Sequence, residues 1–313
     1  MAGTKLSILI TYYNEGVGLA ETLKSLVIPP ELELEILIFD DASKVVPGPY
    51  IPADKAAEVI RSESNVGPAV GRNRLLQSAT GDYIHFHDAD DLFDPEWAIR
   101  ILQEIEDGEP DVIFTEIGVK SQGEWVSEGV QGLQPLTGTE ALVRFCIRHA
   151  ILTSAGVYRA GAVRKIGGYR ESLWQSEDYD FHIRLAASGV SYRMILEPLV
   201  IRVSEAGRSA EKLEVWDCAL KAVELLSQEL PLEFRADLAE AAARMSSILF
   251  RLGARSRARQ GFKLASSLGL VEFKHQQRMY QWVAKKMGPE YAEWLGAGYR
   301  KLLPKTLRKK VRD

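Results

Sequence analysis

The chain has 313 residues and a formal net charge of −4, with 46% hydrophobic and 26% charged residues. This composition is typical of a soluble globular protein, and its charge gives no reason to expect nucleic acid as a partner. No apolar run approaches the ~20 residues of a membrane span, and no signal peptide is visible before the first predicted strand. Cys146 and Cys218 lie far apart in no metal-like spacing, which indicates reduced thiols in a cytoplasmic protein.

Two apolar runs near the N-terminus predict neighbouring strands. Residues 6–10 and 34–39 are continuously apolar, as in parallel strands that helices cover on both faces. A helix is predicted over residues 19–26, and a short one over residues 54–60 before the next crossover. Right-handed crossovers place such strands side by side. The polar residues that follow each strand are therefore expected at one edge of the sheet.

The next segments predict a helix and then a strand that ends in acids. Gly67 permits a tight turn, Pro68 suits the first turn of a helix, and Arg72 follows on that helix. An arginine near acidic strand ends can neutralise carboxylates or grip a diphosphate. The alternative for Arg72 is a surface salt bridge.

The acids after the strand at residues 83–86 predict a metal site. Asp88 and Asp90 are two residues apart, so in extended backbone they project to the same side and repel each other. Carboxylate oxygens suit Mg²⁺ or Mn²⁺, and ligands of α/β sheets bind at the carboxyl ends of strands. The alternative is an acidic loop that only caps the helix beginning near Pro95.

Further elements complete a first domain. The predicted ones are a helix over 95–106, a strand over 111–117, a hairpin over 118–130, a helix over 139–147, a strand or loop over 154–159, and one or two edge strands over 192–203. Another helix opens at Glu177 and Asp178, with Ser176 as its cap. Acids are favourable in a first turn for structural reasons alone. The functional interpretation is that the helix N-terminus keeps Asp178 ionised, so that it can accept a proton.

The composition changes after Ser209, where amphipathic helices are predicted over 211–229, 232–252, 254–267 and 272–286. We therefore predict two domains, residues 1–209 and 210–313. From Tyr299 onward, seven basic residues face one acid, a local charge of +6. A basic amphipathic segment can lie on the inner face of an anionic membrane, and the alternative is a solvated chain end.

Five motifs in order resemble those of the family 2 glycosyltransferases with the GT-A fold, over about the first 205 residues. They are Ile10-Thr11-Tyr12-Tyr13-Asn14-Glu15, Phe39-Asp40-Asp41-Ala42-Ser43, Asn65-Val66-Gly67 with Arg72-Asn73, His87-Asp88-Ala89-Asp90-Asp91, and Glu177-Asp178. The resemblance implies an α/β fold, a Rossmann-like and mostly parallel sheet flanked by helices, followed by an all-α region. It implies a sugar transferase with a nucleotide-sugar donor and a glycan or lipid-linked acceptor.

The resemblance also implies roles for single residues. Thr11, Tyr13 and Asp41 would hold the nucleotide base, which favours UDP, and Glu15 would support their loop. Gly67, Arg72 and Glu177 would complete the donor site. Asp88 would reach the ribose or the metal, Asp90 would bind the Mn²⁺ or Mg²⁺ on the diphosphate, and Asp91 would orient the loop. Asp178 would be the catalytic base, and a single base opposite the leaving group implies inversion.

One position departs from the family pattern. Ser204 stands where many members carry a histidine that binds the metal or the diphosphate, and Glu205 or Arg208 could take that role. Two other classes remain open, a non-catalytic sugar-nucleotide-binding or scaffold protein and a nucleotidyltransferase. The second is disfavoured because no Gly-, Arg- or Lys-rich phosphate loop follows residues 6–10.

Overall fold

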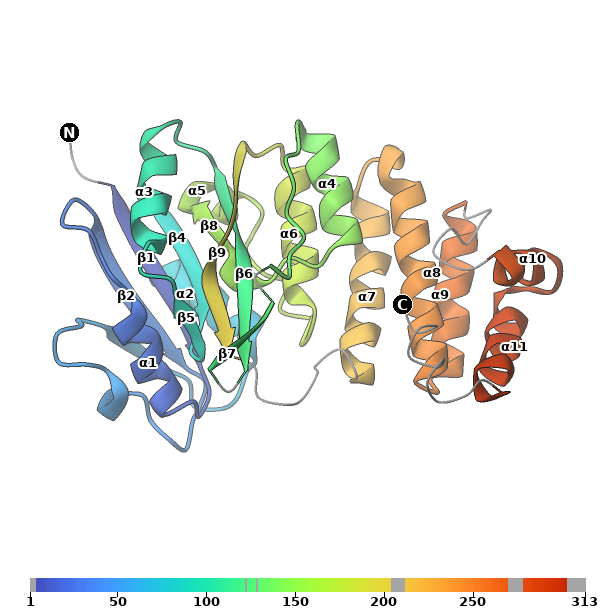
Figure 1. The fold of residues 1–313 in the computed structure, drawn as a ribbon, viewed down its shortest axis with the longest axis horizontal. Helices are drawn as coiled ribbons and strands as arrows, with labels where there is room; N and C mark the ends of the chain where they lie inside the picture. Colours follow the sequence, from blue (N-terminus) through green and yellow to red (C-terminus); the bar gives the residue numbers. More distant parts are fainter. Residues whose placement is uncertain (1–3, 122, 128, 204–211, 270–277, 303–313) are drawn as a thin grey trace. The chain divides into compact units, whose positions relative to one another are not determined.

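Figure 1 shows a computed structural model of the chain, which describes residues 4–121, 123–127, 129–203, 212–269 and 278–302. The chain forms two compact units, Met1–Gly207 and Arg208–Asp313. Within the described ranges, no helix combines the length and the apolar character that crossing a bilayer requires.

The described part of the first unit contains one mixed sheet of nine strands. They are β1 (Lys5–Tyr12), β2 (Glu33–Asp40), β3 (Glu58–Arg61), β4 (Tyr83–Asp88), β5 (Asp91–Phe93), β6 (Val112–Ser121), β7 (Glu124–Ser127), β8 (Gly156–Arg159) and β9 (Tyr192–Val203). Their order is β3-β2-β1-β4-β8-β6-β9-β5, and β7 pairs with β6. The expected parallel pairing holds from β3 through β4 and between β6 and β9, whereas β5, β7 and β8 pair antiparallel with their neighbours.

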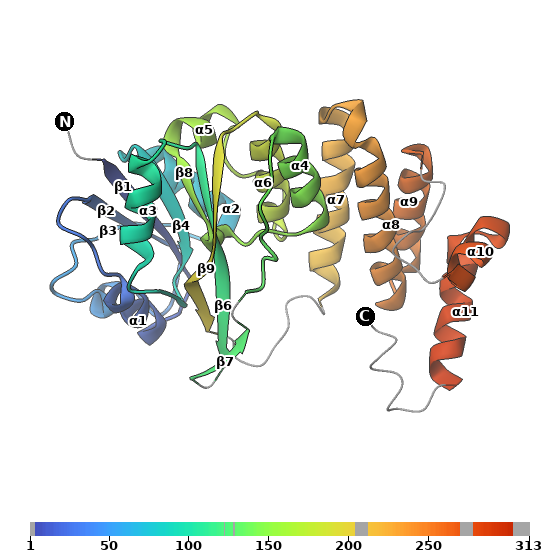
Figure 2. The ribbon, with the colours of Figure 1, turned by 45° about the horizontal axis from the view of Figure 1, so that its top comes forward.

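Helices cover both faces of this sheet, as the apolar runs predict. They are α1 (Val17–Ser25), α2 (Pro68–Ser78), α3 (Trp97–Glu106), α4 (Thr139–Arg148), α5 (Ala160–Lys165) and α6 (Glu177–Ala187). Figures 1 and 2 show α1 and α3 on one face and α2 on the other. Leu6, Ile8, Leu9 and Ile10 of β1 are fully buried, because successive side chains enter the core on opposite faces.

The register of the parallel strands brings the polar strand ends together. Tyr12 at the end of β1 lies opposite Asp40 of β2, and Thr11 lies opposite Asp88 of β4. This confirms the expectation that polar residues from successive strands meet at one edge.

Two expectations about single elements were wrong. The short helix predicted over 54–60 is absent, and Glu58–Arg61 instead forms β3, because it extends the sheet beside the end of β2. Residues 192–203 were expected as edge strands, but β9 lies between β6 and β5. Pairing with the rest of the sheet, which local sequence does not display, decides both cases.

The second unit is helical, with α7 (Leu213–Glu229), α8 (Arg235–Arg251), α9 (Arg255–Ser267), α10 (Arg278–Met287) and α11 (Pro289–Leu302). Gly253, Gly269 and Gly288 have φ near +90° and follow α8, α9 and α10, a backbone conformation that glycine adopts without strain. Helix α11 was not expected from the sequence. The first residues of the helix predicted over 272–286, and the basic tail from residue 303, lie outside the described residues.

Candidate active site

The acidic motif occupies the turn between β4 and β5. The side chain of Asp88 is 45% exposed and Asp90 is exposed, whereas Asp91 is buried. Ser154 Oγ donates a hydrogen bond to Asp91 Oδ2 at 3.1 Å. Burial raises the pKa of Asp91 well above its usual range, and the charges of Asp88 and Asp90 raise it further. Asp91 therefore lies inside the loop, in keeping with the orienting role that the resemblance implies.

His85 and His87, for which no role was predicted, form a chain of polar contacts that reaches the backbone of this turn. His85 Nδ1 lies 2.8 Å from Gly156 O, His85 Nε2 lies 3.0 Å from His87 Nδ1, and His87 Nε2 lies 3.1 Å from Asp91 O. Thr22 Oγ1 of α1 also donates to Asp91 O at 2.7 Å. The backbone of the acidic turn is therefore held by buried polar contacts before any ligand arrives.

The acidic motif fits a divalent cation that a ligand's phosphates help to hold. Burial raises the pKa of Glu15, and the charges of Asp90 and Asp88 raise it further, so these three carboxylates interact electrostatically. Within the described residues, no group of three or more His, Cys, Asp or Glu is arranged to hold a metal by itself. Mg²⁺ characteristically takes one or two carboxylates plus substrate phosphates, and Asp88 and Asp90 supply that number. Ser204 and Glu205, the alternative metal ligands, and Arg208, the alternative diphosphate contact, lie outside the described residues.

Arg72 joins the acidic motif to the start of α6. Its guanidinium donates from Nη1 to Glu177 Oε1 at 2.5 Å and from Nη2 to Asp88 Oδ1 at 3.0 Å. Its side chain is only 5% exposed, so the alternative of a surface salt bridge is wrong. Arg72 also lies over the ring of Tyr169, 5.3 Å from its centroid. It neutralises two site carboxylates that would otherwise repel each other, and any contact with the donor stays a prediction.

Asp178 lies in the first turn of α6, next to this ion pair. Burial and then the charge of Glu177 raise its pKa to about 7, and Arg72 and the N–H of Tyr179 oppose the shift. We expected the helix N-terminus to keep Asp178 ionised. The raised pKa runs against that expectation, because burial and Glu177 outweigh the favourable dipole. A carboxylate with a pKa near 7 is suited to accept a proton at neutral pH.

The other polar groups of α6 have structural partners. Asp180 is fully buried and accepts hydrogen bonds from Arg170 Nε at 3.1 Å and Arg184 Nε at 2.7 Å. Burial lowers the pKa of His182 to about 3, so this ring is neutral. Its Nδ1–H then donates to Asp178 O at 2.9 Å, and its Nε2 accepts from the hydroxyl of Tyr158 at 2.7 Å. Both contacts fix the first turn that carries Asp178.

The start of α6 differs from the serine cap that we predicted. Ser176 precedes the helix in a left-handed conformation, with φ of 57°, and makes no side-chain capping hydrogen bond. Asp178 Oδ1 instead accepts the N–H of Tyr179 at 2.8 Å. The turn into α6 is thus shaped around Asp178 rather than closed by a serine cap.

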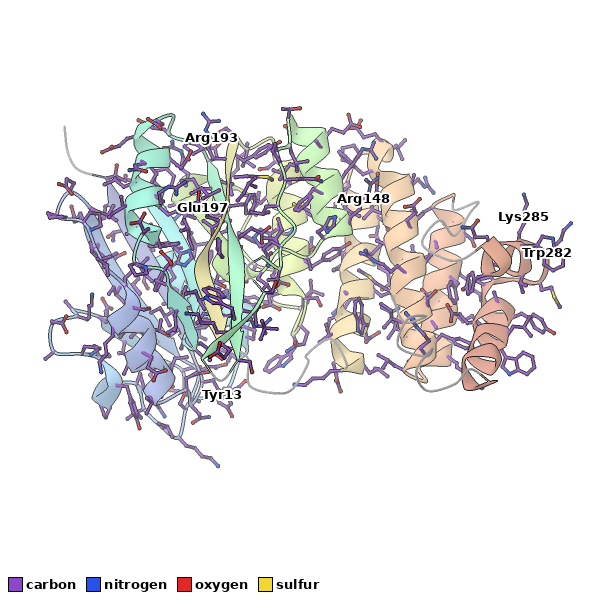
Figure 3. The ribbon with its side chains drawn as sticks, viewed as in Figure 1. Tyr13, Arg148, Arg193, Glu197, Trp282 and Lys285 are labelled. Atoms are coloured by element: carbon purple, nitrogen blue, oxygen red, sulfur yellow. The ribbon has the colours of Figure 1, made fainter. Side chains whose placement is uncertain are left out.

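The residues expected to hold the nucleotide base lie at the ends of β1 and β2. Asp41 Oδ1 accepts the N–H of Val66 at 2.7 Å, and Oδ2 accepts the N–H of Gly67 at 2.9 Å, which ties the end of β2 to the start of α2. Tyr13 is exposed at the lower edge of the view in Figure 3, and its N–H donates to Glu15 Oε2. Glu15 therefore contacts the backbone of the loop after β1, and its supporting role in donor binding stays a prediction.

Trp174, around which we expected part of the acceptor choice to lie, packs beside Gly67 of the predicted donor site. Gly67 has φ of +85°, and a Cβ built on it would come within 2.8 Å of the Trp174 ring. The ring thus lies against a glycine whose N–H donates to Asp41. Trp174 precedes Asp178 by four residues, and 52% of its surface is exposed. The signal in the sequence was the Gly67 turn, but nothing local pairs it with a tryptophan more than a hundred residues away.

A known protein family matches the part of the chain that carries the acidic motif and Arg72. The family described as "Glycosyl transferase family 2" matches residues 7–167, just over half of the chain. A Haemophilus influenzae protein named "Uncharacterized glycosyltransferase" is 33% identical over 216 residues, which cover 66% of this chain and 70% of that protein. The amylovoran biosynthesis glycosyltransferase AmsB of Erwinia amylovora is 27% identical over 219 residues, 64% of this chain and 69% of AmsB.

Solved structures share the fold at low sequence identity. Residues 1–349 of S. aureus TarS in complex with UDP-GlcNAc give a TM-score of 0.58 at 17% identity, covering 95% of this chain and 92% of that one. The mannosyltransferase PcManGT of Pyrobaculum calidifontis, in complex with GDP-Man and Mn²⁺, gives 0.60 at 14% identity, with 100% and 84% covered. These likenesses confirm the GT-A-type fold. The family match over residues 7–167, which carry four of the five motifs, and the relatives named as glycosyltransferases show that the chain belongs to glycosyl transferase family 2 and is a glycosyltransferase.

Proposed function

We propose that the chain transfers a sugar from a UDP-sugar to a hydroxyl of a glycan or lipid-linked acceptor, with inversion at the anomeric carbon. The observation that carries this proposal is Asp178, whose pKa is raised to about 7 beside the Glu177–Arg72–Asp88 ion pairs. These pairs join the proton acceptor to the acidic motif of β4. A displacement reaction needs a base for the acceptor hydroxyl close to the group that binds the leaving diphosphate.

In the proposed reaction, Asp178 removes the proton from the acceptor hydroxyl as its oxygen bonds to the anomeric carbon. The bond between that carbon and the diphosphate oxygen breaks, and the nucleoside diphosphate leaves with the electron pair. Glu177 is the poorer base of the two, because it is buried and paired with Arg72. Asp180 is fully buried between two arginines and cannot reach an acceptor.

The donor would lie along the polar edge of the sheet. Thr11, Tyr13 and Asp41 would hold the uracil, and Gly67 would complete the donor site. Asp41 already fixes the N–H groups of Val66 and Gly67, so its oxygens are held in place before the base arrives. UDP is therefore expected to bind more tightly than GDP.

Asp88 and Asp90 would hold Mn²⁺ or Mg²⁺ against the diphosphate. When bound, such an ion stabilises the negative charge that develops on the leaving group. The chain's own contribution is to present the two carboxylates on a turn that His87, Thr22 and Asp91 keep in place.

The acceptor must approach the segment before α6, because its hydroxyl has to reach Asp178. Trp174 presents a half-exposed ring there, with its position fixed by the contact to Gly67. The apolar C–H face of a sugar ring packs well on such a surface, and an aromatic wall with few polar groups is typical of ligand sites. We infer that Trp174 orients the acceptor. A cytoplasmic setting, and contact between the basic C-terminus and a membrane, belong to the same proposal.

The test separates binding from chemistry with Asp178→Asn. General-base catalysis typically contributes ~10²–10⁴-fold, so hydrolysis of a UDP-sugar in the presence of Mn²⁺ should fall by that factor. Hydrolysis uses water in place of the unidentified acceptor. UDP affinity, measured by thermal shift, should stay unchanged, and Glu171→Gln, an exposed acid in the segment before α6, serves as the control. Hydrolysis within a few-fold of the unaltered protein would remove Asp178 from the role of base.

A further inference from the structure

Basic residues are concentrated in the last part of the helical unit. Residues 208–313 contain 21 Lys or Arg and 12 Asp or Glu, a net charge of +9, whereas residues 1–207 carry −13. Within the helical unit, residues 251–312 hold 16 of the basic residues and only three acids. A field of this size attracts an anionic partner to one end of the chain.

Exposed aromatic side chains occur in the same segment. Trp282 and Trp294 are 63% and 58% exposed, and Met287 and Tyr291 are exposed as well. The rings of Tyr291 and Trp294 lie 5.7 Å apart. We define the α10–α11 surface by Trp282, Lys285, Lys286, Met287, Tyr291 and Trp294.

These exposed side chains are not the core of α10 and α11, because the two helices bury other residues between them. Val283, Ala284 and Ala292 are buried in a small core against which Tyr280 packs. Trp282, Lys285 and Lys286 are spaced three and four residues apart, so they share a helical face. Figure 3 shows Trp282 and Lys285 projecting outward from α10.

The charges of this surface are not neutralised within the described residues. Arg257 pairs with Asp217 and Glu224, and Arg259 pairs with Glu290 through two contacts of 2.8 Å. Lys285 and Lys286 form no such pair in the described part of the chain. They are free to meet an external anion.

A cleft of about 490 Å³ adjoins the surface. Its apolar wall consists of Phe250, Met287, Tyr291 and Trp294. Arg255 supplies a cationic group, and Arg259 lines the cleft paired with Glu290. Arg255 lies over the Phe250 ring, 5.7 Å from its centroid. An apolar wall beside a guanidinium matches a molecule that carries a phosphate next to a hydrocarbon part.

We propose that the α10–α11 surface docks the enzyme on an anionic lipid bilayer. Tryptophan and tyrosine favour the boundary between headgroups and acyl chains, and lysines attract anionic headgroups. A soluble polyanion would engage the lysines but would leave Trp282, Met287 and Trp294 in water. The combination of exposed apolar and cationic groups therefore favours lipid. This inference deepens the membrane contact included in the proposed function.

The test is binding of the full-length protein to vesicles, without donor or acceptor, so its failure leaves the transfer proposal untouched. The probe is an equal mixture of phosphatidylcholine and phosphatidylglycerol, with phosphatidylcholine alone as the neutral comparison. We expect co-sedimentation with the anionic vesicles only, a blue shift of tryptophan emission, and weaker binding at high salt. A single nearby basic residue is worth about five-fold in affinity, so Lys285→Gln with Lys286→Gln should weaken binding by about 25-fold.

The aromatic part is tested with Trp282→Ala combined with Trp294→Ala. This variant should lose at least tenfold in vesicle affinity and most of the blue shift, whereas Trp125→Ala, which removes an exposed tryptophan of the first unit, should lose neither. Circular dichroism verifies that each variant is folded. Vesicle binding unchanged in both sets of variants would overturn the proposal. So would equally tight binding to soluble polyphosphate without an emission shift, which would indicate a polyanion partner instead.

Discussion

The two units of the chain differ in sign of charge and in the exposure of their main ion pairs, although Asp237 and Glu293 of the second unit are buried as well. In the first unit, Arg72, Glu177, Asp91 and Asp180 are buried near one edge of the sheet. In the second unit, Arg257 pairs with its acids near the surface, and Lys285 and Lys286 are exposed.

This difference separates charge that serves chemistry from charge that serves docking. Burying ions costs free energy that their mutual attraction only partly returns, and Arg72 Nε is buried without a hydrogen-bond partner. Groups held at such a cost, with perturbed pKa values, mark a functional site. Exposed ion pairs change the free energy of unfolding little, so substitutions can alter the surface charge of the helical unit without destabilising it.

The largest expected effect comes from removing the arginine of each region. Arg72→Met leaves Glu177 buried without its partner, so the free energy of unfolding should fall by about 3–5 kcal/mol. Arg257→Met removes a similar pair of contacts at a partly exposed site and should cost about 0–1 kcal/mol. Urea unfolding followed by circular dichroism measures both. Equal losses in the two variants would break the comparison.

A smaller effect is expected at the acidic turn, where the charges are accessible. Asp90→Ala should weaken Mn²⁺-dependent binding of UDP by about 100-fold or more while leaving the fold intact. Thermal shift with UDP and with GDP, each with and without Mn²⁺, gives the measurement, and Asp107→Ala at the exposed end of α3 is the control. Unchanged UDP affinity would remove Asp90 from the metal site, and tighter binding of GDP would overturn the uridine preference.

The smallest of these effects concerns the acceptor side. Trp174→Ala should raise the KM for a saccharide acceptor by about fivefold, since one aromatic contact is worth about 1 kcal/mol, and Trp174→Phe should recover most of it. Donor hydrolysis should be unaffected in both variants. A KM for acceptor that does not change, or a loss confined to donor binding, would move Trp174 out of the acceptor site.

Much of the first unit follows from local sequence. The apolar run of β1 and the acids after β4 are properties of short segments, and parallel register then places Thr11 opposite Asp88. The second unit was less predictable. Helix α11 begins at Pro289 just after Gly288, and that pair is typical of a chain break as much as of a new helix.

What the sequence did not show depends on contacts between distant residues. The burial of Arg72 requires Glu177, 105 residues away, and the contact of Gly67 with Trp174 spans a similar distance. The pKa of Asp178 was misjudged for the same reason. Its position in the first turn of a helix is visible in the sequence, but the burial that dominates its pKa is not.

The most direct test of the account is the pH dependence of kcat/KM for UDP-sugar hydrolysis. Asp178 can accept a proton only when ionised, and burial raises its pKa to about 7. The rate should therefore rise about tenfold per pH unit below that value and level off above it, because protonation at low pH removes the base. Asp178→Asn should be slow and lose this rise. A flat profile in the unaltered protein, or the same rise retained in Asp178→Asn, would contradict the assignment of Asp178 as the base.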